Sequence, residues 1–119
     1  MSEANRTRAT FCDLLNLPRG KYIPKAVAEG GHIGFANAVF GVTFDKDLIP
    51  VPGAGVLDGL PDMELRLDAG RRSSWQEDTE IALGDLTAHG EPIGLCARSA
   101  LKRAIATWQA RGLHPMVGL

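Results

Sequence analysis

Short segments that alternate apolar and polar residues, separated by turn-forming residues, make up most of the chain. Residues 7–15 and 21–24 are rich in β-branched and apolar types and flank the turn-forming segment 16–20, which predicts a hairpin. A short helix over residues 25–29 is expected next, because Pro24 suits a first helical turn and two glycines follow. Since it has barely two turns, this helix needs tertiary packing to be stable.

Two further strands are predicted downstream of this helix. Residues 35–44 mix small, apolar and aromatic types, as a strand does. Residues 62–68 alternate strictly, with Met63, Leu65 and Leu67 on one face. This alternation is typical of a half-buried strand.

A second hairpin is predicted from residues 80–87 and 91–96, with its turn at 88–90. Two long loops precede it, at residues 49–61 and 69–78. Three prolines and three glycines exclude regular structure from the first of these loops. Loops of this length are usually functional or mobile.

Residues 98–111 form the single long helix that the pattern predicts. Its apolar positions recur at the spacing of one helical face, and they are Leu101, Ala104, Ile105 and Trp108. We therefore expect Trp108 to pack in the core. Residues 116–119 resemble the start of another strand, where the sequence stops. Together these elements predict one compact α+β unit built on a curved mixed sheet, without internal repeats.

Composition narrows the class of protein. The 119 residues carry a net charge of −1, with 45% hydrophobic and 23% charged side chains, as ordinary globular domains do. Acidic and basic residues nearly balance, so nothing favours nucleic acid or an anionic membrane as a partner. No apolar run approaches the ~20 residues of a membrane span, and the first residues lack a secretory signal. Cys12 and Cys96 are isolated in sequence, which favours buried, reduced thiols and a cytoplasmic protein.

Sequence signatures of autonomous catalysis are absent. The chain has neither a P-loop nor a G-x-S-x-G motif. Its three histidines are far apart, each beside a glycine or proline, and loop positions explain them better than a metal site does. We therefore predict no metal ligands and no catalytic residues in this chain.

Several polar and aromatic residues have both a functional and a purely structural interpretation. Asp58, Asp62, Glu64 and Asp68 surround the first long loop, although the solvated outer face of a strand explains most of them. Arg19 and Lys21 are able to hold an anion, but a turn that keeps its charges in water is the simpler interpretation. Trp75 is either an interface anchor or a lid over the sheet.

Several stretches, in this order along the chain, resemble motifs of the glutamine synthetase family. They include an opening hairpin with Arg-Gly-Lys, a Pro-Asp strand, a tryptophan, an Asp-Leu strand, a Gly-x-Pro turn and the start of a helix with its following strand. The matching residues are 11–24, 61–67, Trp75, 81–86, 89–92, 97–103 and 112–118. No single motif is specific to the family, but the order and spacing of the motifs together are. The resemblance covers about residues 7–119.

The resemblance implies that residues 1–119 are a single N-terminal β-grasp domain, with a larger catalytic C-terminal domain absent. The family uses ATP to join the γ-carboxylate of glutamate to ammonia or an amine, through a γ-glutamyl phosphate. ATP and Mg2+ or Mn2+ bind the larger domain in that family. The resemblance therefore implies that this domain binds no cofactor by itself and is inactive when isolated.

The resemblance also implies a ring of identical subunits, in which a loop of this domain closes the active site of its neighbour. Candidate residues of the closing segment are Asn37, Asp62 and Asp68, and candidate interface residues are Arg19, Lys21 and Trp75. Ammonia-using members carry an aspartate in a D-G-S-S stretch of the closing loop. Residues 34–41 lack it, which resembles the γ-glutamyl-polyamine or another amine-ligating branch.

Two other functions remain as alternatives. The first is a free-standing β-grasp module that binds a protein without enzymatic activity; it predicts a completed last strand and a capped sheet edge. The second is a small enzyme in its own right, for which the sequence offers no convergent set of polar residues. The abrupt end of the sequence favours the ligase domain over both.

Overall fold

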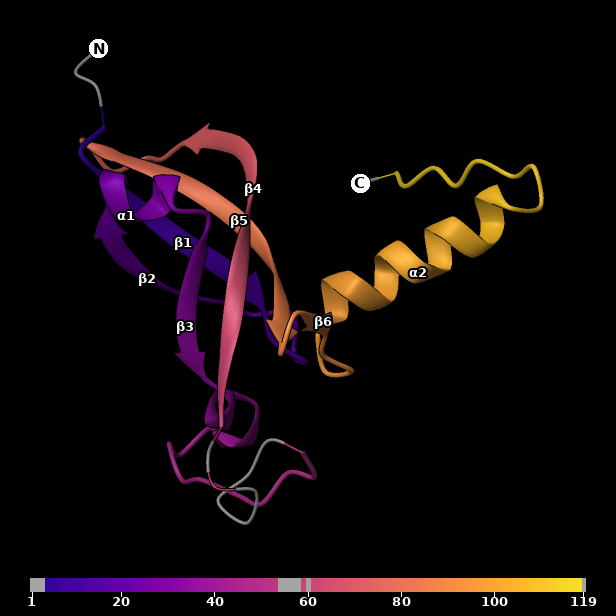
Figure 1. Cartoon of the computed structure of the whole chain (residues 1–119), viewed down its shortest axis with the longest axis horizontal. Helices are drawn as coiled ribbons and strands as arrows, with labels where there is room; N and C mark the ends of the chain where they lie inside the picture. The colour runs from indigo at the N-terminus through magenta and orange to yellow at the C-terminus, as the bar shows by residue number, and fades with distance from the viewer. Residues whose placement is uncertain (1–3, 54–58, 60, 119) are drawn as a thin grey trace.

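The computed structural model describes residues 4–53, 59 and 61–118. Its main element is a curved mixed β-sheet (Figure 1). The strand order is β2-β1-β5-β4-β3, and the short β6 pairs with β5 outside this order. In chain order the elements are β1 (Arg6–Cys12), β2 (Pro18–Pro24), α1 (Lys25–Glu29), β3 (His32–Ala36), the 3-10 helix η1 (Asn37–Gly41), β4 (Asp62–Ser73), β5 (Thr79–Ala88), β6 (Glu91–Pro92) and α2 (Ala97–Gln109).

Strand pairing confirms the predicted α+β class. β1 and β5 run parallel at the centre of the sheet, while β1–β2, β3–β4, β4–β5 and β5–β6 are antiparallel. The first hairpin, the short helix α1 and the long helix α2 lie where the sequence predicts them. A curled sheet with one short and one long helix is a β-grasp-like arrangement.

The sheet curls so strongly that its two edge strands meet. Lys21 of β2 donates a hydrogen bond from Nζ to the carbonyl oxygen of Gly34 on β3, at 2.6 Å. Inside this curl, the rings of Phe11 and Phe35 lie edge to face, with their centroids 5.2 Å apart. The Lys21 side chain of β2 therefore partly closes the edge of the sheet at β3.

The apolar core lies on the concave face of the sheet, against α1 and η1. Leu65 of β4 lies opposite Leu86 of β5, and Ala9 of β1 lies opposite Ala82 of β5. The buried cluster consists of Ala9, Phe11, Ile23, Ala28, Ile33, Met63, Leu65, Leu86 and Cys96. Phe35, Val39, Phe40, Leu67 and Ile93 pack around it. This confirms the predicted inward face of residues 62–68.

Two predicted elements have different bounds in the structure. In place of the strand expected over residues 35–44, the structure has β3 at His32–Ala36 followed by η1. The Asn37 amide still bonds the Pro61 carbonyl in the register of β3 and β4, and the chain then turns into η1. The expected loop over residues 69–78 is half strand, since β4 runs on to Ser73 across an irregularity between Leu67 and Arg71.

One strand of each hairpin is shorter than predicted, whereas β2 begins at Pro18, within the predicted turn 16–20. β1 stops at Cys12, because the next residue, Asp13, turns the chain with its side chain. The returning strand of the second hairpin keeps only Glu91 and Pro92 of its predicted residues 91–96.

Helix α2 projects from the sheet instead of packing along it (Figure 1). The radius of gyration is 15.9 Å, above the about 13.5 Å of a compact chain of this length. Trp108 is 53% exposed, so its predicted place in the core is wrong. Residues 113–118 do not form the predicted strand. Both cysteines are free, but Cys12 is only half-buried, whereas Cys96 is buried as predicted.

Candidate functional site

Asn37 is the most deeply buried of the sequence-predicted site residues. Only 6% of its surface is exposed, at the point where β3 gives way to η1. Its backbone N–H donates to the carbonyl of Pro61, at 3.1 Å, and its side-chain Nδ2 donates to the carbonyl of Gly53, at 2.9 Å. Both bonds tie the start of η1 to the long loop before β4. The amide orientation is thereby fixed, with Oδ1 as its acceptor end.

The Oδ1 atom of Asn37 is buried and has no hydrogen-bond partner within the described residues. A buried acceptor without a partner costs roughly 1–3 kcal/mol, so native structures rarely leave one unexplained. Asn37 also lines a pocket of about 480 Å3. No local sequence pattern signals this burial, because it depends on Pro61, 24 positions further along.

The pocket beside Asn37 lies between η1, the long loop and the turn after β5. Asp62, the exposed first residue of β4, borders it, as does His89 of the β5–β6 turn. The remaining described lining is mainly apolar or backbone: Pro52, Gly53, Pro61, Ala88, Ile93, Gly94 and Leu95. The structure thus brings two of the three predicted closing residues, Asn37 and Asp62, to one site.

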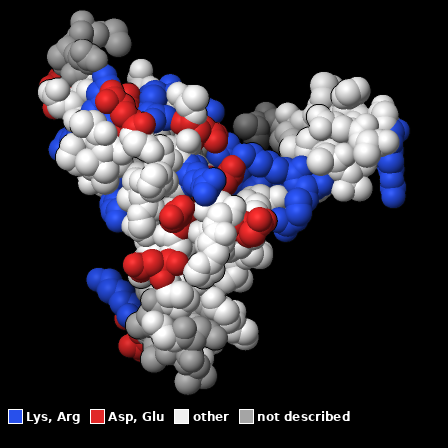
Figure 2. All heavy atoms as spheres, viewed as in Figure 1, with Lys and Arg blue, Asp and Glu red and all other residues white. Residues whose placement is uncertain are grey.

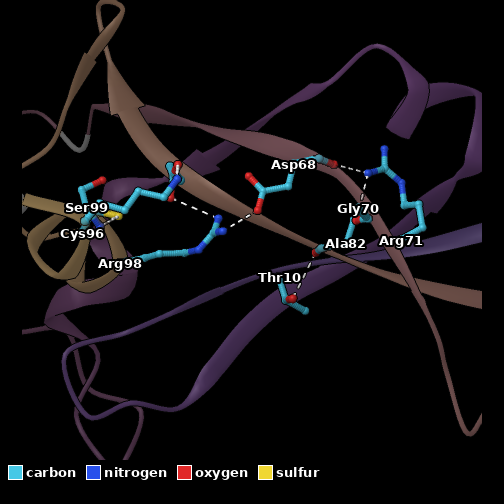
Figure 3. Close-up of polar contacts among 10 residues, drawn as sticks. Thr10, Asp68, Gly70, Arg71, Ala82, Cys96, Arg98 and Ser99 are labelled. Carbon is cyan, nitrogen blue, oxygen red and sulfur yellow. Dashed lines mark hydrogen bonds and ion pairs between the residues drawn. The ribbon is translucent and has the colours of Figure 1, made fainter. Parts of the chain in front are cut away.

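Asp68 lies outside this pocket, six residues further along β4, or about 20 Å along an extended strand. Its carboxylate forms an ion pair with Arg98 of α2 (Figure 3). Arg98 also contacts Asp85 of β5 at 3.1 Å, and Lys102 pairs with the same Asp85. The hydrogen bond from Arg98 holds the pKa of Asp68 below its ordinary value, and Asp68 in turn raises the pKa of Arg98. This network attaches the first turns of α2 to the sheet.

Arg19 and Lys21, predicted as interface residues, are both engaged inside the domain. Arg19 Nε pairs with the buried Asp13 carboxylate at 2.7 Å. Lys21 bonds Gly34 and lies over the ring of Phe35, 4.5 Å from its centroid. Their contacts explain the shape of the first hairpin and the closure of the sheet edges without a ligand.

Trp75 is 83% exposed, in the turn between β4 and β5. It is therefore not a lid over the sheet, and of the two roles weighed from sequence the exposed anchor remains. Asp58, the other acidic residue considered from sequence, lies outside the described residues.

Helix α2 presents an apolar surface that its sequence pattern assigned to the core. Leu101 is 58% exposed, and the segment after the helix exposes Leu113, Met116 and Val117 as well. Figure 2 shows the helix and this segment as largely uncharged, with basic side chains where the helix leaves the sheet. The helical spacing identified the apolar stripe but not its exposure, because the spacing does not specify what the stripe packs against.

Among the described residues, no three His, Cys, Asp or Glu side chains gather in a group that would hold a metal ion. None of the described helices is long and apolar enough to cross a membrane.

Comparison with known proteins finds relatives that are similar in sequence and in fold. No family model matches the chain. A curated protein, type-1 glutamine synthetase 2 of Dictyostelium discoideum, is 32% identical over 114 residues, which cover 90% of this chain but 22% of that protein. The chain thus spans about a fifth of the length of this relative.

Solved structures share the fold. GmaS without ligand matches with a TM-score of 0.69 and 21% identity, over 91% of this chain and 24% of that chain. A GmaS/ADP complex matches with a TM-score of 0.68 and 21% identity, over the same shares of the two chains. A structure described as a novel glutamine synthase homolog matches with a TM-score of 0.70 and 19% identity, over 93% of this chain and 28% of that one.

Proposed function

We propose that this chain, a glutamine synthetase-like domain whose predicted family resemblance the comparisons confirm, is the N-terminal part of an ATP-dependent ligase. The ligase joins the γ-carboxylate of glutamate to ammonia or an amine. Within it, the domain packs against a neighbouring subunit and helps to close that subunit's active site. By itself the domain has no ligase activity.

The exposed apolar stripe of α2 is the observation that carries this proposal. Leu101 and Trp108 lie on one helical face, and each exposes more than half of its surface. An ordered helix that leaves its sheet with an uncovered apolar face is typical of a surface that another part of the protein covers. Relatives several times longer than this chain support the same conclusion.

The closing role belongs, in this proposal, to the pocket that Asn37 and Asp62 share. Its opening between two loops allows the domain to cover a neighbour's substrate and exclude water from a reactive acyl phosphate. Asp68, already neutralised by Arg98, acts instead by holding α2 on the sheet. Trp75, exposed and free of the core, remains the candidate interface anchor.

ATP and Mg2+ or Mn2+ are assigned in this proposal to the remainder of the ligase. One of the solved relatives is a complex with ADP, which supports nucleotide use by the family. The role of this domain is then to complete a site that another polypeptide segment builds.

The mass of the native species tests this assignment. An antibody against the 119-residue chain should detect a polypeptide several times heavier than 12.7 kDa in a lysate of the native cells. A species of 12.7 kDa alone would contradict the ligase assignment. It would favour the free-standing β-grasp binding module instead, whose partner would then be sought at α2 and Trp75.

A further inference from the structure

We propose that the face of the sheet opposite the apolar core binds an acidic peptide segment of another protein, through the guanidinium groups of Arg6, Arg8 and Arg72. These residues belong to β1 and β4, and they lie outside both α2 and the pocket beside Asn37. The inference therefore stands apart from the proposed ligase role.

Strand register places these side chains in a row across four strands. Arg8 of β1 lies opposite both Tyr22 of β2 and Ile81 of β5. Ile81 in turn lies opposite Arg72 of β4. Paired residues of neighbouring strands point to the same side of a sheet, and successive residues point to opposite sides. Because Ala9, next to Arg8, belongs to the buried core, the row faces away from the core.

Tyr22 gathers two of the arginines. The guanidinium carbon of Arg6, two residues before Arg8 on the same side, is 5.4 Å from the centroid of the Tyr22 ring, and that of Arg8 is 5.9 Å from it. Both distances are in the range of cation–π contacts. The Tyr22 hydroxyl donates to Oε1 of Gln76, and Arg6 Nε donates to the Thr79 hydroxyl, each at 2.7 Å. These bonds orient the ring and one guanidinium group before a partner arrives.

The three arginines have no carboxylate partners of their own. Within the described part of the chain, none of Arg6, Arg8 and Arg72 forms an ion pair. Arg6 and Arg72 are exposed, and Arg8 is half-buried. Their positive charges are thus available to a partner that carries carboxylates.

Most acidic side chains close to the row in sequence are occupied by other groups. Glu80 pairs with Arg71 at 3.3 Å, and Asp78 accepts the backbone N–H just before β1 at 2.9 Å. Asp85, four residues beyond the row along β5, is paired with α2. Glu77 is exposed in the turn before β5, and it forms no ion pair with a described residue.

The spacing of the row favours a chain of carboxylates. Arg8 and Arg72 are two strands apart, about 10 Å, with the half-buried Ile81 between them. Side chains two residues apart in an extended peptide point to the same side, about 7 Å from each other. An apolar residue with Asp or Glu two positions before and after it would therefore meet Ile81 and both arginines. Guanidinium groups bind carboxylates through two parallel hydrogen bonds.

The nearby cavity does not suit a small free anion. Arg72 borders a cavity of about 570 Å3 at the β4–β5 turn, but Glu77, Asp78 and Glu80 line it as well. Three carboxylates in the lining disfavour an enclosed phosphate or carboxylate by charge repulsion. The open row across the sheet, without such carboxylates, is the better place for an anionic partner.

Titration of the 119-residue chain, followed by NMR, tests the inference directly. The probes are a capped peptide of sequence Glu-Glu-Leu-Glu-Glu, its counterpart Gln-Gln-Leu-Gln-Gln, and inorganic tripolyphosphate, all at equal ionic strength. We expect the glutamate peptide to saturate shifts at the Ile81 methyl groups and the Arg8 side chain. The glutamine peptide should cause no saturable shift, and tripolyphosphate, which has no apolar group for Ile81, should bind more weakly than the glutamate peptide.

Two substitutions locate the surface and one controls for charge. Arg8→Gln and Arg72→Gln should each weaken binding of the glutamate peptide by about two- to fivefold, as loss of an exposed ion pair does. Arg103→Gln removes the same charge from an exposed position on α2 and should leave binding unchanged. If Arg8→Gln disturbs the sheet, the comparison of Arg72→Gln with Arg103→Gln still decides the question.

Equal binding of the glutamate and glutamine peptides would overturn the inference, as would equal effects of Arg72→Gln and Arg103→Gln. Absence of any saturable shift would overturn it too. Tripolyphosphate that binds as tightly as the glutamate peptide would assign the arginines to small polyanions and not to an acidic protein segment.

Discussion

Lys21 on one edge of the sheet donates a hydrogen bond to the Gly34 carbonyl on the opposite edge, at 2.6 Å. The two residues belong to β2 and β3, which stand at opposite ends of the strand order. Only a strongly curled sheet brings such strands together. The contact covers part of an exposed strand edge, and exposed edges are otherwise prone to pair with other chains.

Lys21→Met should therefore destabilise the domain by about 1–2 kcal/mol, through loss of the bond to Gly34 and of the cation–π contact with Phe35. Urea unfolding measures the change. Arg103→Met is the matched control, since exposed Arg103 forms no ion pair within the described residues, and it should change stability by less than about 0.5 kcal/mol. Equal effects of the two substitutions would show that the edge contact contributes nothing.

Asp13 should make the domain sensitive to acid. Burial acts to raise its pKa, but hydrogen bonds from the Leu17 amide, the Arg19 side chain and the Leu15 amide outweigh burial and lower the pKa. A lowered folded-state pKa contributes stability above the unfolded value of about 3.9, and this contribution is lost as the pH falls through the folded value.

Asp13→Asn should consequently lower the free energy of unfolding at pH 7 by about 1–2 kcal/mol and flatten its decline below pH 4. Urea midpoints at pH 7 and pH 3 provide the comparison. Asp45→Asn, on an exposed turn, serves as the control and should keep the wild-type decline. If the free energy of unfolding of Asp13→Asn fell between pH 7 and pH 3 as much as that of the wild type, Asp13 would not be the cause of the acid sensitivity.

Arg98 should govern how firmly α2 is held on the sheet. Arg98→Ala removes the pairs with Asp68 and Asp85, whose partly exposed positions limit the cost to about 1 kcal/mol or less. The amides at the start of α2 should then exchange with solvent about three to ten times faster, which hydrogen exchange measures. Arg103→Ala, further along the helix, should leave these rates unchanged.

Gly84 of β5 lies tight against the backbone of β4. A Cβ at this position would stand 2.4 Å from the carbonyl oxygen of Arg66, which is backbone and cannot easily move away. Gly84→Ala should cost about 2 kcal/mol or more of stability in thermal or urea unfolding. Gly94→Ala is the control, because its Cβ would meet nothing within 4 Å, and it should be close to neutral.

The apolar stripe of α2 should cause the isolated chain to associate. Light scattering at increasing concentration should detect this association, and Trp108→Ser should reduce it. Phe44→Ser removes an aromatic ring that is fully exposed on a different surface, and should leave the association unchanged. If Phe44→Ser reduced the association and Trp108→Ser did not, the associating surface would be the turn that carries Phe44 and not α2.

Local patterns predicted the elements whose partners lie nearby or whose faces are sharply divided. Strict alternation of Met63, Leu65 and Leu67 identified both a strand and its buried face, and turn residues bounded α1. Long-range contacts escaped prediction. The true extent of β3 depends on its pairing with the distant β4, and the extension of β4 depends on pairing with β5.

The same difference between local patterns and long-range contacts applies to the residues of the candidate site. Asn37 and Asp62 were selected from a family resemblance, and the structure places them at one pocket, whereas Asp68 is separated from them. Arg19 and Lys21 looked like free surface charges because their partners, Asp13 and Gly34, are set by the turn and by the curl of the sheet. The stripe containing Trp108 has the spacing of a core face but lies exposed.

Nucleotide turnover by the native species tests the central claim most directly. Material captured from native cells with an antibody against this chain would be supplied with ATP, a divalent cation, glutamate and an amine. The account predicts ADP formation that requires both glutamate and the amine or ammonia, from a polypeptide heavier than 12.7 kDa. Captured heavier polypeptide that forms no ADP under these conditions, or forms it equally without glutamate, would contradict the assignment of this domain to a glutamate ligase.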